Sequence, residues 1–229
     1  KKERPLWRLL GGVRKKIDAG IVLTGPIDEW FYKRVDAAVE TGYKRVKLKI
    51  DGTTNVDELE KLVCAYPNMY FFADGNGIFS ELGLQVLQEF DSVGLTLIEQ
   101  PFMEEDWALH EQASRTMKTP IALDESLRSV EDVSRMIEQS AGKIIVLKPG
   151  RVGGITESLR IHELANRTGL PIWLGGMIEL GVSKAHNLAL ASLPKMIYPG
   201  DFSASTYFWE EDIIQPIIEV EKGQLHLSE

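Results

Sequence analysis

The 229-residue sequence predicts an α/β barrel, in which parallel strands alternate with helices that cover the sheet. Short apolar runs recur along the chain, and a helix-like segment follows almost every run. Most of the runs have a continuous apolar character, as expected for strands that are buried on both faces of a parallel sheet. Eight such runs suit a closed barrel, although the count alone also allows an open, doubly wound sheet.

Each predicted strand is a run of three to six residues, and each predicted helix lies in the interval that follows a strand. Asp28 and Ser80 stand at the starts of two helices, where their side chains can cap the first turn. The strands are expected at residues 19–23, 45–50, 69–73, 96–99, 121–124, 143–148, 172–174 and 196–198. The helices are expected at residues 28–41, 56–65, 80–90, 105–117, 130–139, 155–168 and 182–192.

The same pattern predicts how the chain is divided. A lead-in at residues 1–18 precedes a barrel at residues 19–211, and an extension at residues 212–229 breaks the strand–helix rhythm. Within the extension, two apolar stretches at residues 217–220 and 225–227 flank a short turn-like stretch. We therefore expect a hairpin that lies outside the barrel.

The composition argues against several classes of function. The chain has 26 Lys and Arg against 34 Asp and Glu, a net charge of −8, so nucleic acid and anionic membranes are not expected partners. No apolar run reaches the length of a membrane span, and no signal-like segment follows the first residues. The single cysteine, Cys64, is expected to be a small core residue and fits a reducing compartment. These features predict a cytoplasmic protein.

Five charged residues stand at the ends of five consecutive predicted strands: Lys49, Asp74, Glu99, Asp124 and Lys148. Neighbours in this series are 24 or 25 residues apart, about one strand–helix unit, so each residue occupies the same place in its unit. Barrel enzymes keep their active sites at the carboxyl ends of their strands. The spacing therefore predicts that these five side chains meet in one site.

The order of the strands around a barrel suggests a role for each residue. Lys49 and Lys148 end the second and sixth predicted strands, which lie half a circumference apart, so the two amines should face each other. Asp74, Glu99 and Asp124 occupy the arc between them, where three carboxylates repel one another unless a cation joins them. Hard oxygen ligands without a neighbouring His or Cys favour Mg²⁺, with Mn²⁺ as an alternative.

Lys47 and Lys49 lie on the same face of their predicted strand. If that face is buried, desolvation and like-charge repulsion both favour an uncharged amine, which could take a proton near neutral pH. If the face is open to water, the two lysines are only a solvated surface. The strand itself does not decide between these interpretations.

Other residues of the predicted site also leave alternatives open. Asp74 fits a turn residue, and Glu125 could replace Asp124 as a ligand, although it should point to the opposite face of the strand. Arg151 stands in a glycine-rich loop, where it either only builds the loop or acts on Lys148 by like-charge repulsion.

Five motifs surround these residues: KLK at 47–49, DGN at 74–76, IEQP at 98–101, LDES at 123–126 and LKPGRVGG at 147–154. As a set they resemble the enolase superfamily, in its muconate-lactonising-like branch. Within that branch, three further stretches resemble the o-succinylbenzoate synthases and the N-acylamino acid racemases. These stretches are GGMIE at 175–179, AHNLALA at 185–191 and YPGD at 198–201.

The resemblance implies that Asp74, Glu99 and Asp124 bind Mg²⁺ and that Lys49 and Lys148 are the acid/base pair. It also implies a set of auxiliary residues, among them a cation beside the first lysine and a loop whose backbone lines the substrate pocket. These auxiliary or substrate-binding residues are Lys47, Asn76, Arg151, Gly175, Gly176 and Met177.

The resemblance further implies an enzyme, a Mg²⁺-dependent hydro-lyase of menaquinone biosynthesis. It would form o-succinylbenzoate from 2-succinyl-6-hydroxy-2,4-cyclohexadiene-1-carboxylate by proton abstraction next to the carboxylate and a Mg²⁺-stabilised enediolate. An N-acylamino acid (N-succinylamino acid) racemase, or an enzyme with both activities, is the alternative because the site residues coincide. The family's N-terminal α+β capping domain is expected to be missing, so a catalytically incompetent barrel fragment is a further alternative. A homo-oligomer is compatible with the resemblance.

Overall fold

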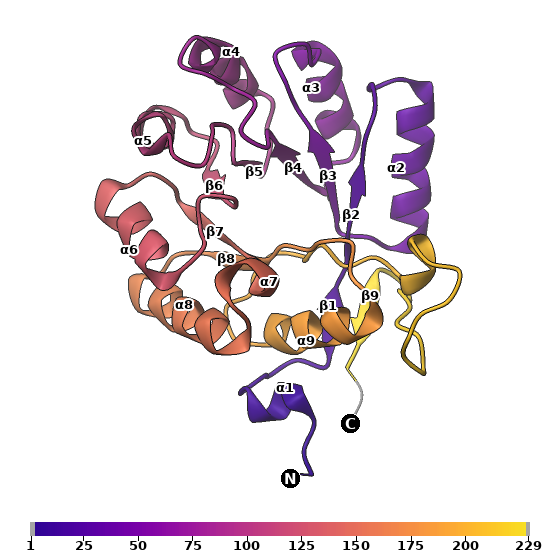
Figure 1. The fold of residues 1–229 in the computed structure, drawn as a ribbon. Helices are drawn as coiled ribbons and strands as arrows, with labels where there is room; N and C mark the ends of the chain where they lie inside the picture. The colour runs from indigo at the N-terminus through magenta and orange to yellow at the C-terminus, as the bar shows by residue number, and fades with distance from the viewer. Residues whose placement is uncertain (1–2, 228–229) are drawn as a thin grey trace.

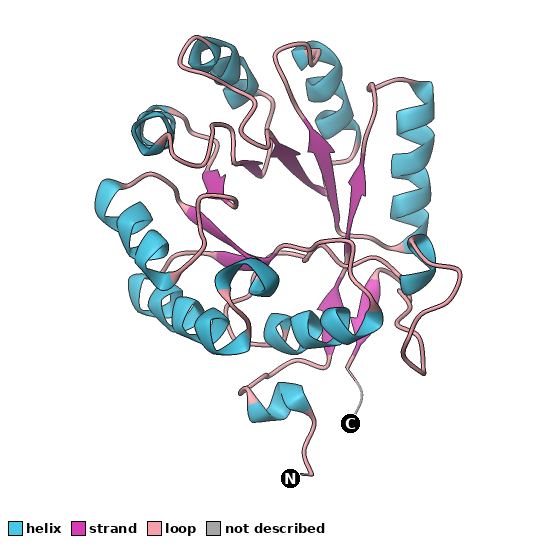
Figure 2. Cartoon of the chain, in the orientation of Figure 1, coloured by secondary structure: helices cyan, strands magenta, loops and turns pink. Residues whose placement is uncertain are grey.

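The computed structural model describes residues 3–227, and within this range seven parallel strands form one curled sheet in chain order (Figure 1). Helices alternate with the strands and lie on the outer side of the sheet (Figure 2). This arrangement confirms the α/β organisation expected from the sequence. The strands are β2 (Gly20–Leu23), β3 (Arg45–Lys49), β4 (Tyr70–Asp74), β5 (Leu97–Glu99), β6 (Ile121–Leu123), β7 (Ile144–Leu147) and β8 (Ile172–Leu174).

The seven predicted helices agree closely with the observed ranges except around α4, whereas the short helices α1 and α7 were not predicted. The side chain of Asp28 accepts a hydrogen bond from the Phe31 N–H and caps α2, as expected. Ser80 does not cap α4, because the chain is still extended at Phe79, which forms a parallel bridge to Phe102. The helices are α1 (Leu6–Leu9), α2 (Glu29–Thr41), α3 (Val56–Ala65), α4 (Gly83–Glu89), α5 (Trp107–Thr116), α6 (Val130–Gln139), α7 (Pro149–Val152), α8 (Ile155–Thr168) and α9 (Gly181–Ala191), with two short 3₁₀ turns, η1 (Phe90–Ser92) and η2 (Ser205–Tyr207).

The expected eighth strand at residues 196–198 does not form. Met196 makes one parallel bridge to Ile172 of β8, and Gly200 makes another to Ala19, next to β2. This segment therefore connects the two edges of the curled sheet through isolated bridges rather than a ladder. Pro199 lies between the two bridged residues, Met196 and Gly200, and a proline has no N–H to donate to a strand ladder.

The predicted hairpin near the C-terminus is also wrong. The chain makes only a tight turn at Glu221 and Gln224, whose backbones bond to each other, and no ladder joins residues 217–220 to 225–227. Instead, β9 (Gln224–His226) pairs antiparallel with β1 (Lys16–Asp18) from the lead-in. This pairing places Leu225 opposite Ile17 and buries both side chains, which a free hairpin would not do.

The core has two layers. The larger one fills the space between the sheet and the helices, and a smaller cluster inside the curl of the sheet includes Phe72 and Trp173. Helix α3 shows how sequence sets burial: Leu59 and Leu62 are buried, whereas Cys64 is exposed on the other side of the helix. The expectation that Cys64 is a core residue is therefore wrong. Among the described residues, no helix has both the length and the apolar character needed to cross a bilayer.

Candidate active site

The five charged residues singled out by their spacing lie at the carboxyl ends of five consecutive strands. Lys49, Asp74 and Glu99 are the last residues of β3, β4 and β5, and Asp124 and Lys148 directly follow β6 and β7. The strand register sets Lys49 beside Asp74 and Asp74 beside Glu99. The curled sheet thus brings residues that are far apart in sequence to one edge.

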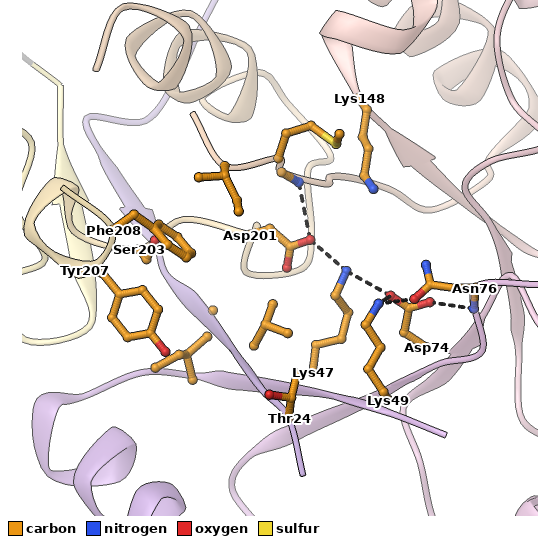
Figure 3. Close-up of a pocket in the computed structure, with 16 residues that line it drawn as sticks. Thr24, Lys47, Lys49, Asp74, Asn76, Lys148, Asp201, Ser203, Tyr207 and Phe208 are labelled. Carbon is orange, nitrogen blue, oxygen red and sulfur yellow. Dashed lines mark hydrogen bonds and ion pairs between the residues drawn. The ribbon is translucent and has the colours of Figure 1, made fainter. Parts of the chain in front are cut away.

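A cavity of about 510 Å³ opens at this edge (Figure 3). Lys47 and Lys49 rise from β3 on one side of it, and Lys148 enters from the opposite side. Glu99 and Asp124 are completely buried, so they lie beneath the cavity surface. The two lysines expected to face each other across the mouth therefore share one cavity.

Lys47 is surrounded by three carboxylates. Its Nζ lies 2.8 Å from Asp201 Oδ2, 3.2 Å from Glu99 Oε1 and 3.6 Å from Asp74 Oδ2. Burial by itself would lower the pKa of Lys47, but these carboxylates raise that pKa above its ordinary value. The buried lysine of the β3 pair is therefore charged, which is the opposite of the uncharged amine expected from burial and repulsion.

Two residues that the sequence did not assign to the site, Arg45 and Asp201, anchor Lys47. The guanidinium of fully buried Arg45 donates to Asp201 Oδ1 and to the carbonyls of Pro199 (3.1 Å) and Gly200 (2.8 Å). Burial would raise the pKa of Asp201, but Arg45 and Lys47 hold that pKa well below its ordinary value. One sequence signal could have found Asp201: it comes shortly after the predicted strand at residues 196–198, much as the five spaced charged residues stand at the ends of their predicted strands.

Lys49 is more open than Lys47, with 44% of its side chain exposed. Its Nζ donates to Asp74 Oδ2 at 2.7 Å and also to Asn76 Oδ1. Asn76 has a left-handed backbone, φ 43°, and its side-chain amide donates to Glu125 Oε1 at 2.9 Å. Asn76 thus connects Lys49 to half-buried Glu125, whose pKa is raised by burial and by Asp124.

Lys148 occupies a deeper position, with 10% of its side chain exposed, and its Nζ lies 2.6 Å from Asp124 Oδ2. Arg151, on the unpredicted short helix α7, pairs with the other oxygen of Asp124. Arg151 therefore does more than build a loop: it shares a carboxylate with Lys148. A Cβ on Gly175 would lie 2.8 Å from Lys148 Cε, so this glycine leaves room for the lysine. 

The next two residues of the glycine loop reach the cavity. Gly176 and Met177 line it, and the Gly176 N–H donates to Asp201 Oδ2 at 3.3 Å. A Cβ on Gly176 would lie 2.5 Å from the Asp201 carbonyl oxygen, so a larger residue would push this loop off Asp201. The loop therefore contributes backbone rather than side-chain hydrogen bonds here.

The three acids Asp74, Glu99 and Asp124 have the chemistry of a divalent-metal site. All three are buried, and the pKa of Glu99 is raised well above its ordinary value by burial and by the two neighbouring aspartates, against the opposing effect of Lys47. In the structure each acid is paired with a lysine, and within residues 3–227 no three His, Cys, Asp or Glu side chains surround a common point. The fit to Mg²⁺ thus rests on the carboxylate oxygens as the donor type, and not on an assembled coordination geometry.

The curled parallel sheet with ionisable groups at its carboxyl edge is typical of the α/β barrel class of protein domains. Residues 30–229 match the family described as Enolase C-terminal domain-like, and the chain belongs to this family, within the enolase superfamily. It is 41% identical to an N-succinylamino acid racemase of Thermus thermophilus, over 99% of this chain and 62% of the relative. It is 40% identical to an o-succinylbenzoate synthase of Bacillus subtilis, over 100% of this chain and 62% of the relative.

A solved structure, an enolase superfamily member from Listeria innocua, superposes on the chain with a TM-score of 0.95 at 35% identity. The superposition covers 98% of this chain and 61% of that one. The chain thus spans about 62% of the length of the two curated relatives described above.

Proposed function

We propose that this domain removes a proton from the carbon next to a substrate carboxylate, in the dehydration that forms o-succinylbenzoate. The observation that carries the proposal is the placement of Lys49 and Lys148 on opposite sides of one cavity, with buried carboxylates between them. A lysine placed within reach of an acidic C–H can act as a general base. The 40% identity to a synthase supports the choice of reaction.

The buried carboxylates are the proposed metal ligands. In the structure they are paired with lysines, and a metal ion could take over that role. Asp74 and Asp124 are now paired with the positively charged side chains of Lys49 and Lys148. Bound Mg²⁺ would supply this positive charge instead and would stabilise the negative charge that the substrate carboxylate gains. With the carboxylates satisfied, the two amines can exchange protons with a substrate.

In the dehydration, Lys49 takes the proton, and the electron pair of the C–H bond moves first onto the neighbouring carboxylate and then back into the ring as the hydroxyl group leaves. The carbon–oxygen bond to the hydroxyl group then breaks, and the Lys49 ammonium returns its proton to the leaving oxygen as water. Lys148, on the other face, donates a hydrogen bond to the charge that develops on the carboxylate. The more open position of Lys49 suits a group that must reach both a carbon and a leaving oxygen.

N-succinylamino acid racemisation is the second candidate. Dehydration needs one base, whereas racemisation needs a proton donor and an acceptor on opposite faces of one carbon, which Lys49 and Lys148 provide. The 41% identity to a racemase supports this candidate as well. An enzyme with both activities would use the same two lysines.

The rim of the cavity bears on whether the chain is competent by itself. Met177 and Ile178 are exposed at the rim, together with Tyr207 and Phe208. We propose that a capping segment of the kind implied by the family covers this rim and excludes water. Without it, the barrel would be a catalytically incompetent fragment.

Menaquinone biosynthesis in the cytoplasm is the setting implied by the synthase proposal, and a homo-oligomer is compatible with it.

The test follows two reactions in D₂O with Mg²⁺: deuterium uptake at the α-carbon of N-succinyl amino acids, and dehydration of the synthase substrate. Dehydration supports the first proposal, and exchange without dehydration would replace it with the racemase. If a folded chain shows neither activity, adding the capping segment separates an incomplete enzyme from an inactive one. Chelation by EDTA should abolish either activity, and Mg²⁺ or Mn²⁺ should restore it.

A further inference from the structure

Gln100 has an unusual place directly after Glu99. Its side chain is 1% exposed, and its backbone lies in the left-handed region with φ 38°. Few residues other than glycine adopt this region, and they do so when the surrounding contacts hold them there. We therefore expect the contacts of Gln100 to hold it in this conformation.

The side-chain amide of Gln100 uses all of its hydrogen-bonding capacity on two loops. Its Oε1 accepts from the backbone N–H of Asp124 at 2.9 Å and of Ser126 at 3.2 Å. Its Nε2 donates to Ser126 Oγ at 2.7 Å and to the Phe102 carbonyl at 3.0 Å, and it also lies 3.4 Å from His110 Nε2 on α5. A glutamine amide can accept two hydrogen bonds and donate two, so this group is saturated.

The backbone of Gln100 reaches a third loop. Its N–H donates to the Ala122 carbonyl of β6 at 2.8 Å, and its carbonyl accepts from the Gly77 N–H at 2.8 Å. Gly77 belongs to the loop that follows Asp74. One residue therefore bonds to the loops that carry Asp74 and Asp124 and is covalently joined to Glu99.

We propose that Gln100 is a positioning residue that fixes the spacing of the three acids and thereby sets the affinity of the site for a divalent cation. This inference rests on the proposed function, in which Asp74, Glu99 and Asp124 bind the metal. Groups that hold metal ligands in place commonly change metal affinity by about 10-fold to 100-fold when they are removed. Gln100 holds two of the ligands through their loops and the third through the chain.

The choice of variant separates the side chain from the backbone. Gln100→Gly deletes the amide, suits the left-handed conformation and keeps the backbone bonds to Gly77 and Ala122. Gln100→Met keeps the side-chain volume and, like glutamine, places a non-glycine residue in the left-handed conformation, but it removes the side-chain hydrogen bonds. It replaces the glycine variant if that variant does not fold. Gln112→Ala, at an exposed position on α5, is the matched control.

The experiment is calorimetric titration of the full 229-residue chain with Mn²⁺ alone, without substrate, at a temperature where urea unfolding shows each variant to be folded. We expect the Mn²⁺ dissociation constant to rise about tenfold or more in Gln100→Gly or Gln100→Met and to stay unchanged in Gln112→Ala. In an activity assay, excess Mn²⁺ should restore most of the lost turnover.

A folded Gln100 variant that binds Mn²⁺ as tightly as the wild type, whatever its loss of stability, overturns the positioning role and leaves the proposed function intact. A wild-type chain that binds no Mn²⁺ overturns the metal site itself, and the positioning role with it. Mn²⁺ binding by the wild-type chain therefore tests the metal site, and the comparison of the Gln100 variants with the wild type tests the positioning role.

Discussion

The two sides of the cavity place the same chemical group in different surroundings. On the β3 side, Lys49 lies at the rim with 44% of its side chain exposed, and on the β7 side Lys148 is sunk to 10%. Each pairs with one aspartate at a strand end, and each has a second cation close by, Lys47 or Arg151. The difference shows that position at a strand end does not by itself set the depth of a side chain.

The residue two positions before each lysine in the sequence explains why Lys49 is exposed and Lys148 is nearly buried. On β3 that residue is Lys47, which faces the same way as Lys49 and already occupies the buried place among the carboxylates. On β7 it is Val146, which is apolar and buried, and Gly175 leaves the space that Lys148 fills. The β3 side thus has a charged residue, Lys47, beneath an exposed lysine, and the β7 side has an apolar residue, Val146, beneath a sheltered lysine.

The largest expected effect comes from removing each of the two proposed bases in turn. Lys49→Ala and Lys148→Ala should each lower the rate of dehydration or exchange by about 10³-fold. Their stabilities should differ, because Lys148→Ala removes a partner of buried Asp124 and costs about 2 kcal/mol, whereas Lys49→Ala costs less than about 1 kcal/mol. Turnover assays measure the loss of rate, and urea unfolding measures the loss of stability. Equal losses of stability would show that the two lysines contribute equally to the fold despite their different burial.

Asp201→Asn should destabilise the β3 side by about 3 kcal/mol at neutral pH, because Arg45 and Lys47 lose the charge of a buried partner. The pKa of Asp201 is held below its ordinary value in the folded state, so its carboxylate stabilises the fold above the unfolded-state pKa of about 3.9. That stabilisation is lost as the pH falls through the lower, folded-state pKa.

Urea unfolding at several pH values tests this linkage. The difference in free energy of unfolding between wild type and Asp201→Asn should be full above about pH 5 and should shrink as the solution is acidified below about pH 4. A difference that stays constant down to the acid limit would show that Asp201 does not act through its charge.

Gly175→Ala tests the sheltered position of Lys148. The added Cβ would lie 2.8 Å from both Lys148 Cε and Val146 Cγ1, so the lysine must move, and kcat should fall about tenfold to a hundredfold with a smaller change in KM. Gly52→Ala is the control, because a Cβ there meets nothing within 4 Å. Steady-state kinetics of both variants provide the comparison, and equal rates would mean that the depth of Lys148 is not important for turnover.

The smallest expected effect is on the open side. Asn76→Gly keeps the left-handed backbone but removes the oxygen that accepts from Lys49, so turnover should fall by about fivefold, corresponding to one hydrogen bond of about 1 kcal/mol. Lys195→Gly makes the same backbone change at an exposed position, φ 63°, and should leave kcat unchanged. A loss of 10³-fold would instead give Asn76 a role as large as that of a base.

Local sequence patterns predicted much of the fold. Periodicity located the seven strands that form the sheet, and the expected helices at 56–65, 130–139 and 155–168 have the observed bounds of α3, α6 and α8. The errors fall where tertiary contacts compete with local preference. Residues 196–198 lack a ladder because Pro199 interrupts it, and β9 pairs with β1 because that pairing buries Leu225 against Ile17.

The sequence by itself determined where the five charged residues stand. A strand–helix unit has a nearly constant length, so a spacing of 24 or 25 residues places Lys49 through Lys148 at the same edge of a parallel sheet. Only the tertiary structure decided which groups meet across that edge. Lys47 pairs with Asp201, 154 residues away, because the sheet curls until its first strands approach the segment after β8. Periodicity fixes the face and the level of a side chain, whereas such a partner, and hence whether the lysine is charged, depends on the closure of the sheet.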